Sequence, residues 1–315
     1  MDKKGFTAYL ESKGNTVENI HYNIRFIEKF FAKVKKEDIN ITKPDILKYL
    51  EYLKTHTRQQ NETRRHCLAA LNHYFTFLYK NEKISDNPCF LIKIRGLKRK
   101  RLYNIFTPEE LDTLCDNYYE LFVRNFDNSR FRNELQQQMS DLSRSQNAVI
   151  LSILVNQGVT TGEINKIELD DVDLIKAKIK IRGGLSSNER TIPLKATQIG
   201  LIIHYLQNIR PKILEYNTNE SNKLFLSFPD NTKKSTNSKY LQYTYFQLTN
   251  QLKTINKKFL NFKQVRASVI SFWIKNHGLR KAQYLAGHRY VSSTENYLQN
   301  NLDDLIDDIN KLHPF

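Results

Sequence analysis

A dense run of basic residues divides this chain into two parts. Six of the nine residues from Lys93 to Arg101 (KIRGLKRKR) are lysine or arginine. Like charges at this density repel one another and hold the backbone extended, so we expect a linker here rather than part of a core. The 315 residues are enough for two domains. We therefore predict a first domain over residues 1–92, a linker over 93–103, and a second domain with a C-terminal tail over 104–315.

The first 92 residues have the pattern of a helical bundle. Apolar residues recur at three- and four-residue steps between Ile20 and Val34, which is the spacing of an amphipathic helix. Thr42, followed by Pro44, is a signal for the start of a second helix. A third helix is predicted to begin near Asn61. We expect a compact bundle of about four helices.

The second domain is expected to be mostly helical. Thr107, followed by a proline and with Glu110 three residues further on, has the pattern of a helix N-cap with a reciprocal glutamate. Residues 124–146 are polar and rich in arginine, glutamine and asparagine, so we expect a loop or an insertion there. Residues 148–155 are predicted to form a short buried helix that ends at Gly158.

One segment of the second domain has the pattern of a β-hairpin. Residues 176–182 alternate charged side chains with Ala177, Ile179 and Ile181, which is typical of a half-buried strand. Two glycines then predict a turn, and residues 189–194 a return strand. The expected fold class is therefore mainly α with a small antiparallel β-sheet.

The charge of the chain predicts a nucleic-acid partner. The sequence has 49 lysine and arginine residues against 33 aspartate and glutamate residues, a formal net charge of +16, which favours binding to a polyanion. No apolar run approaches the roughly 18 residues that span a bilayer, and the N-terminus lacks the apolar core of a signal peptide. The three cysteines have no metal-like spacing. We expect a cytoplasmic protein without membrane, metal or cofactor.

The segment from Gly287 to Tyr297 (GHRYVSSTENY) has the residues for phosphate chemistry. Ser292 and Glu295 have capping-box spacing, which would place Tyr297 in the second turn of a short helix and His288 in the loop before it. A tyrosine hydroxyl beside an acid/base histidine can attack a phosphate and hold it covalently. For an isolated pair, a core tyrosine and a structural histidine would be the simpler interpretation.

Three separated segments resemble motifs of the tyrosine recombinase (phage integrase) family. GVTTGEINKIELDDVDL (158–174) resembles the family pattern T-G-x-R-x-x-E-L-x-x-L-x-x-x-D-I/V, and IRGGLSSNERTIPL (181–194) resembles its β-hairpin with a similar E-R-x-x-P-L ending. KQVRAS (263–268), followed by LAGH and Tyr297, resembles the block H-x-x-R-H…L-G-H…Y. The resemblance covers essentially the whole chain and implies a helical core-binding domain followed by a mixed α/β catalytic domain.

The resemblance implies site-specific recombination, as in the integration of a mobile element. Tyr297 would attack a DNA phosphodiester to give a 3′-phosphotyrosine, and Arg266 would grip the phosphate with its planar guanidinium fork. His288 would donate to the same phosphate or move the proton. Lys263, three residues before Arg266, would face the same site, and Glu163 would orient the phosphate-binding groups. The expected partners are double-stranded DNA and further copies of the chain, from a dimer to a tetramer.

Four groups of the family pattern are replaced here, and the mildest change is Lys263 in place of the first histidine of the H-x-x-R-H block, since lysine keeps a proton donor and a cation. Thr160 stands in place of the first arginine, Leu185 (or Gly184 under a one-residue shift) in place of the hairpin lysine, and Ala267 in place of a histidine. Arg182, which we count among the catalytic candidates, or Lys180 could restore a cation, as could a partner subunit. Two functions therefore stay open: an active recombinase, or a catalytically impaired DNA-binding protein of recombinase descent, such as a replication initiator or a regulator. A nicking enzyme of the topoisomerase IB type is a third possibility.

The candidates for DNA contact are basic residues in three groups. Basic and amide side chains suit phosphate and base-edge contacts, and a solvated surface is the alternative for each. The candidates are Arg58, Arg64 and Arg65 at the start of the third helix, Lys98, Arg99, Lys100 and Arg101 in the linker, and Lys257 and Lys258 before the KQVRAS segment.

Overall fold

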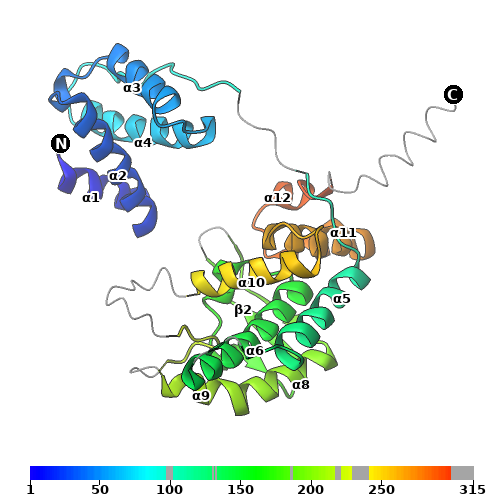
Figure 1. Ribbon diagram of the computed structural model, residues 1–315. Helices are drawn as coiled ribbons and strands as arrows, with labels where there is room; N and C mark the ends of the chain where they lie inside the picture. Colours follow the sequence, from blue (N-terminus) through cyan, green and yellow to red (C-terminus); the bar gives the residue numbers. More distant parts are fainter. Residues whose placement is uncertain are drawn as a thin grey trace, which may run out of the picture. The chain divides into compact units, whose positions relative to one another are not determined.

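The chain forms two compact units, Met1–Arg101 and Leu102–Phe315 (Figure 1). The structure, a computed structural model, describes residues 1–96, 102–129, 131, 133–184, 187–216, 221–228 and 241–298. The division falls at the end of the basic run. The four linker candidates from Lys98 to Arg101, and the tail after residue 298, lie outside the described residues. Within the described ranges, no helix is long and apolar enough to cross a membrane.

The described part of the first unit, residues 1–96, contains four α-helices, as the sequence predicts. They are α1 (Lys3–Ser12), α2 (Val17–Val34), α3 (Lys43–Thr55) and α4 (Asn61–Lys80), with a 3-10 turn at Asp38–Asn40. Helix α2 buries the predicted apolar stripe, and Ile27 and Phe30 are completely inaccessible. Burial of each such side chain stabilises the fold by about 1.5–3 kcal/mol. The predicted helix start at Thr42 is also confirmed, since Thr42 and Asp45 form a capping box.

The second unit is built around helix α6, which packs against α5, α8, α9, α10 and α11 (Figure 1). Its helices are α5 (Pro108–Tyr118), α6 (Glu134–Gln157), α7 (Thr161–Ile164), α8 (Ala196–His204), α9 (Arg210–Glu215), α10 (Gln242–Ile255), α11 (Phe262–Ala286) and α12 (Val291–Glu295). Short 3-10 or π-helical segments cover Tyr119–Arg124, Leu169–Asp171 and Tyr205–Ile209. Helix α5 begins with the predicted capping box of Thr107 and Glu110.

A small antiparallel sheet completes the second unit, with strand order β1 (Val172–Asp173), β2 (Lys178–Ile181) and β3 (Arg190–Pro193). The predicted hairpin is strands β2 and β3, in the register that pairs Ile179 with Ile192 and Ile181 with Arg190. Side chains alternate between buried and exposed along both strands. This alternation places Arg190 on the buried face. The fold class, mainly helical with a small antiparallel sheet, is the predicted one.

The expected loop over residues 124–146 is wrong for most of its length. Residues from Glu134 onward form the first half of α6, and the predicted helix at 148–155 is the end of that same helix. Glutamate, glutamine and arginine are good helix formers, and a polar helix is stable where its buried polar groups have partners. Gln146 has them: its amide donates to Leu226 O (2.9 Å) and its carbonyl accepts from Tyr205 Oη (2.8 Å). The predicted end at Gly158 is confirmed, with φ of 55°.

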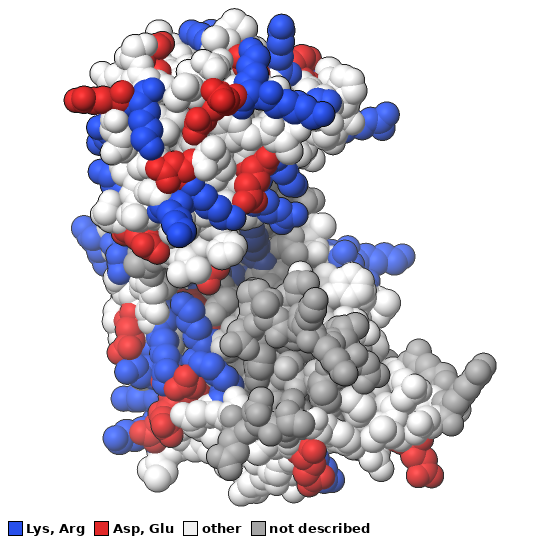
Figure 2. All heavy atoms as spheres, turned by 90° about the vertical axis from the view of Figure 1, so that its left-hand side faces the viewer, with Lys and Arg blue, Asp and Glu red and all other residues white. Residues whose placement is uncertain are grey.

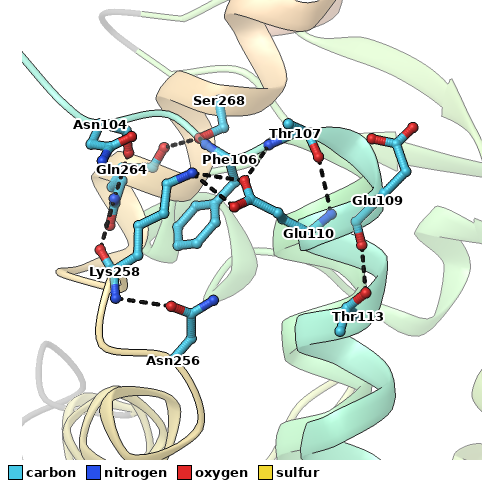
Figure 3. Close-up of polar contacts among 10 residues, drawn as sticks. All are labelled: Asn104, Phe106, Thr107, Glu109, Glu110, Thr113, Asn256, Lys258, Gln264 and Ser268. Atoms are coloured by element: carbon cyan, nitrogen blue, oxygen red, sulfur yellow. Dashed lines mark hydrogen bonds and ion pairs between the residues drawn. The ribbon is translucent and has the colours of Figure 1, made fainter.

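The first residues of the second unit are held against the start of α11 (Figure 3). Gln264 donates to Asn104 O (2.7 Å), and Ser268 Oγ accepts from the backbone N–H of Phe106 (2.9 Å). The ammonium of Lys258 lies 2.7 Å from a Glu110 oxygen and 4.9 Å from the centre of the Phe106 ring. Helix α11 is therefore fixed to the segment through which the chain enters this unit.

Candidate active site

Helix α11 bends back on itself, and the bend assembles a cluster of charged groups. Gly278 has φ of 76° and ψ of 167° inside the helix, a backbone conformation that essentially only glycine adopts. Twenty residues of straight helix would separate Arg266 from Ala286 by about 30 Å. Instead, Arg266 Nη2 donates to Ala286 O at 2.8 Å. Nothing in the sequence pattern marks Gly278 as a residue that shapes the site.

Arg266 is the centre of this cluster and is largely buried. Its Nη1 donates to Gly158 O (2.5 Å) and lies 3.5 Å from a Glu163 oxygen, and its Nη2 lies 3.3 Å from His288 Nε2. Burial lowers the pKa of Arg266, whereas the charge of Glu163 and the charge and hydrogen bond of Tyr297 raise it. The guanidinium therefore joins the ends of α6 and α11 to the histidine and tyrosine of the C-terminal motif.

His288 is held between Arg266 and helix α12. Its Nδ1 lies 2.9 Å from Thr294 Oγ1. Because arginine can only donate, the hydrogen-bond network assigns Nε2 as the acceptor and places the proton on Nδ1. Burial, followed by the charges of Arg266 and Arg190, lowers the pKa of His288 to about 4. The imidazole is therefore neutral near pH 7 and can accept a proton.

Tyr297 follows α12 and stacks on His288. The two ring centres are 5.6 Å apart and the ring planes differ by 16°. The tyrosine is partly buried against the core of the second unit. The predicted capping box at Ser292 is wrong, because α12 begins at Val291 with Tyr290 as its N-cap, so that Ser292 already lies in the first turn. Tyr297 consequently lies beyond the helix and not in its second turn.

Glu163 supplies the negative charge of the cluster. One oxygen accepts from Arg190 Nη1 (2.6 Å), and the other accepts from the backbone and hydroxyl of Thr160 (2.8 and 3.0 Å). Burial alone would raise the pKa of Glu163, but the hydrogen bond and charge of Arg190, with smaller contributions from Thr160 and Arg266, lower it below its ordinary value. Glu163 therefore stays ionised between two guanidinium groups.

Arg190 is the member of the cluster that the sequence analysis missed. Its side chain is completely buried, and its Nε donates to Leu285 O (2.7 Å). The turn after α11 lies directly against it, since a Cβ on Gly287 would overlap Arg190 Nη1. Two backbone contacts tie the hairpin to that turn: Asn188 N donates to Gly287 O (2.8 Å), and Ser187 forms a β-bridge with His288. An arginine at an inward-facing position of a strand was the signal that could have identified it.

The remaining catalytic candidates are exposed or form ion pairs outside the cluster around Arg266. Lys263 is exposed in the first turn of α11. Arg182 does not join the cluster as expected, because its guanidinium pairs with Glu168 (2.7 Å) and Asp171 (2.8 Å). Lys180 pairs with Glu189 (3.0 Å). Both hairpin cations that were candidates to replace the absent arginine are thus neutralised by acidic neighbours. Leu185 lies outside the described residues.

The candidates for DNA contact divide into exposed and engaged side chains. Arg58 and Lys257 are exposed, and Arg65 is exposed beside Glu62 (2.5 Å). Arg64, in contrast to the expectation, is buried and joins α4 to α3 by donating to Leu50 O (3.0 Å). Lys258 is engaged by Glu110, as described above. On the face shown in Figure 2, lysine and arginine side chains are widespread, with acidic side chains between them.

The cluster has the groups that a phosphate-transfer site needs. A phenol, a neutral imidazole and two guanidinium groups lie around one carboxylate, so the positive charges outnumber the negative one. Guanidinium groups bind phosphate oxygens well, and a phenol close to a proton acceptor can act as a nucleophile. In the part of the chain that the structure describes, no cluster of three or more His, Cys, Asp or Glu side chains could hold a metal ion.

Comparison with known proteins points to one family. Residues 129–303, more than half of the chain, match the model of the phage integrase family. A tyrosine recombinase XerC from Natranaerobius thermophilus is 26% identical over 98% of this chain and 97% of its own length. A tyrosine recombinase from Thermosipho africanus is 24% identical over 99% of this chain and 100% of its own length.

Solved structures share the fold. XerH recombinase bound to a palindromic difH substrate aligns with a TM-score of 0.61 at 17% identity, over 91% of this chain and 77% of that one. A lambda integrase dimer bound to a COC′ core site aligns with the same TM-score of 0.61 at 12% identity, over 94% of this chain and 93% of that one.

Proposed function

Because this chain belongs to the phage integrase family of tyrosine recombinases, we propose that it is an active site-specific DNA recombinase with Tyr297 as its nucleophile. The observation that carries the proposal is the convergence of Arg266, His288 and Tyr297. Arg266 and His288 are 22 positions apart in the sequence but 3.3 Å apart in space, and Tyr297 stacks on the histidine.

The proposed reaction is a transesterification. The phenolic oxygen of Tyr297 attacks the phosphorus of a DNA phosphodiester, a Tyr297–phosphorus bond forms, and the bond from phosphorus to the 5′-oxygen breaks. The phenol loses its proton and the departing 5′-oxygen gains one, so that no oxidant, reductant or nucleotide is consumed. A 3′-phosphotyrosine and a free 5′-hydroxyl result, and attack by the 5′-hydroxyl of another strand reverses the step onto a new partner.

The surrounding residues are suited to this step. Arg266 would stabilise the negative charge that grows on the phosphate oxygens, and a preorganised donor of this kind typically contributes about 100- to 1000-fold in rate. His288, neutral near pH 7 because its pKa is lowered to about 4, would accept or relay a proton. Lys263, exposed one turn before Arg266, would approach the DNA from the solvent side.

The proposal includes assembly of several copies on DNA. Each chain has one Tyr297, so exchange of strands between two duplexes requires at least two copies. The exposed basic residues Arg58, Arg65 and Lys257 are proposed to contact the DNA backbone, and affinity should then fall steeply with salt because bound counterions are released.

A second candidate function is DNA binding without cleavage. It is favoured by Thr160, which replaces the family's first arginine and serves as a helix cap. It is also favoured by Arg266, whose N–H groups already donate to Gly158 O and Ala286 O.

A trapping experiment distinguishes the two functions. A binding site is first selected from a pool of random DNA duplexes, and a nick is then placed close to each candidate cleavage position so that the cut strand diffuses away. The recombinase should leave a covalent protein–DNA band on a denaturing gel. Tyr297→Phe should abolish the band, whereas Tyr290→Phe, at a tyrosine that is 71% exposed in the same segment, should keep it. Tight, salt-sensitive binding with no band at any pH would support the binding protein instead.

A further inference from the structure

The cluster contains a guanidinium with an unused hydrogen-bond donor. Arg190 donates through Nε to Leu285 O (2.7 Å) and through Nη1 to Glu163 (2.6 Å). Its Nη2 is buried and has no hydrogen-bond partner among the described residues. A buried N–H group without a partner is destabilising, and such groups are rare in folded proteins unless a ligand or a function accounts for them.

Arg190 and Arg266 share one counter-ion. Glu163 accepts from Arg190 with one oxygen and lies 3.5 Å from Arg266 Nη1 with the other. With His288 neutral, the two guanidinium groups and the one carboxylate leave one positive charge in excess. A phosphodiester carries one negative charge and would balance it.

The two hairpin-strand cations considered above, Arg182 and Lys180, cannot fill this place without breaking existing ion pairs. Arg182 is bound by Glu168 and Asp171, and Lys180 by Glu189. Position 160, where the family pattern has an arginine, holds a threonine whose hydroxyl caps α7 and bonds to Glu163. Glu163 is therefore paired with the guanidinium of Arg190 on strand β3, and not with one from residue 160.

We propose that Arg190 supplies the second guanidinium that binds the scissile phosphate, in place of the arginine that is absent at position 160. This assignment rests on the proposed function. Nη2 donates to a non-bridging oxygen of the phosphate, while Nη1 stays on Glu163 and fixes the orientation of the fork. Because the side chain is completely buried, the residues that cover Nη2 must move when DNA binds.

The test compares a normal scissile phosphate with a methylphosphonate, in which an uncharged methyl group replaces one non-bridging oxygen. The full-length protein and the nicked duplex of the trapping experiment are used, and the rate of covalent complex formation is measured. Arg190→Gln should slow the reaction about 100- to 1000-fold on the phosphate. Its loss on the methylphosphonate should be much smaller, because the charge that Arg190 balances is then absent.

Arg210→Gln is the matched control. Arg210 is also a largely buried arginine of the second unit, and its guanidinium donates to the backbone carbonyls of Ser221 and Lys223. Its loss is structural, so any decrease in rate should be equal on the two substrates. If Arg190→Gln also lost the same factor on both substrates, or if Arg182→Gln alone showed the selective loss, the assignment would be overturned.

Two further variants distinguish a loss of phosphate binding from a folding defect. Arg190→Lys keeps a positive charge beside Glu163 but removes Nη2, so it should fold and still react slowly on the phosphate. Adding Thr160→Arg to Arg190→Gln should recover part of the lost rate, because it returns a guanidinium to the other side of Glu163. Normal rates in Arg190→Lys, or no recovery in a folded double variant, would count against the assignment. If the unmodified chain formed no covalent complex at all, the proposed function would fail, and the assignment with it.

Discussion

The bend in α11 makes a prediction that separates backbone conformation from side-chain packing. A Cβ added at Gly278 or at Gly200 would meet no atom within 4 Å. The two sites differ in the backbone: Gly200 lies within the regular helix α8, whereas Gly278 has φ of 76° and ψ of 167°. Alanine at the two positions should therefore change stability in opposite directions.

The expected magnitudes follow from these conformations. Alanine at position 278 has to adopt a conformation that costs about 1–3 kcal/mol, or the helix straightens and the contacts of Arg266 with Ala286 and His288 are lost. For a unit of this size that corresponds to a decrease in Tm of roughly 2–12 °C. Gly200→Ala should instead stabilise the unit by about 0.5–1 kcal/mol, because alanine is the better helix former.

The single tryptophan makes the measurement specific. Trp273 lies in α11 and is buried in the core of the second unit, so its fluorescence during urea or thermal unfolding reports this unit and not the first. Gly278→Ala should also reduce covalent complex formation, since the bend brings Ala286 and His288 to Arg266. If both variants shifted the transition by the same amount in the same direction, the bend would not be a constraint on the fold.

Three further predictions concern charges. Glu163→Gln should destabilise the second unit by about 3–5 kcal/mol, since it leaves two buried guanidinium groups without a counter-ion, whereas Glu189→Gln, in an exposed pair, should cost at most about 1 kcal/mol. Because folding lowers the pKa of Glu163, the difference in stability between wild type and Glu163→Gln should shrink as the pH falls below the ordinary glutamate pKa. An equal difference in Trp273 unfolding curves at pH 7 and pH 3 would argue against this prediction. Folding lowers the pKa of His288 from 6.5 to about 4, so as the pH decreases the unfolded chain binds the proton before the folded chain does. The contribution of His288 to stability should therefore be lost between about pH 6.5 and about pH 4. His288→Gln should remove that part of the pH dependence in the same unfolding assay. Lys257→Ala should weaken DNA binding and lower the slope of log affinity against log salt by about 0.9. Lys258→Ala should leave that slope nearly unchanged, because the ammonium of Lys258 is engaged by Glu110. Equal slopes in fluorescence-anisotropy titrations of the two variants would contradict this prediction.

Local sequence signals predicted the elements that depend on neighbouring residues. Thr42 and Thr107 begin helices because their hydrogen-bond partners lie three residues away, and the alternation around Ile179 identifies a strand by itself. Arg266, His288 and Tyr297 were found as candidates by their resemblance to family motifs, and the structure brings them together.

The residues that were missed or misplaced depend on distant parts of the chain. The first half of α6 has the composition of a loop, but Gln146 is satisfied there by Leu226 and Tyr205, which are 80 and 59 positions away. Arg64 has the sequence context of a surface cation, and only the packing of α3 against α4 buries it. Arg190 belongs to the cluster because the alternation along β3 turns it inward and the bend at Gly278 brings Leu285 to it, and the bend does not follow from the sequence pattern.

The identity of the residue that becomes attached to DNA tests the central claim most directly. Trypsin digestion and mass spectrometry of the trapped complex should find the nucleotide on the peptide that begins at Tyr290, and fragmentation should place it on Tyr297 through a phosphate at the 3′ end of the DNA. Attachment to Tyr290 or to any other residue, or through a 5′-phosphate, would contradict the assignment of Tyr297 beside Arg266 and His288 as the nucleophile.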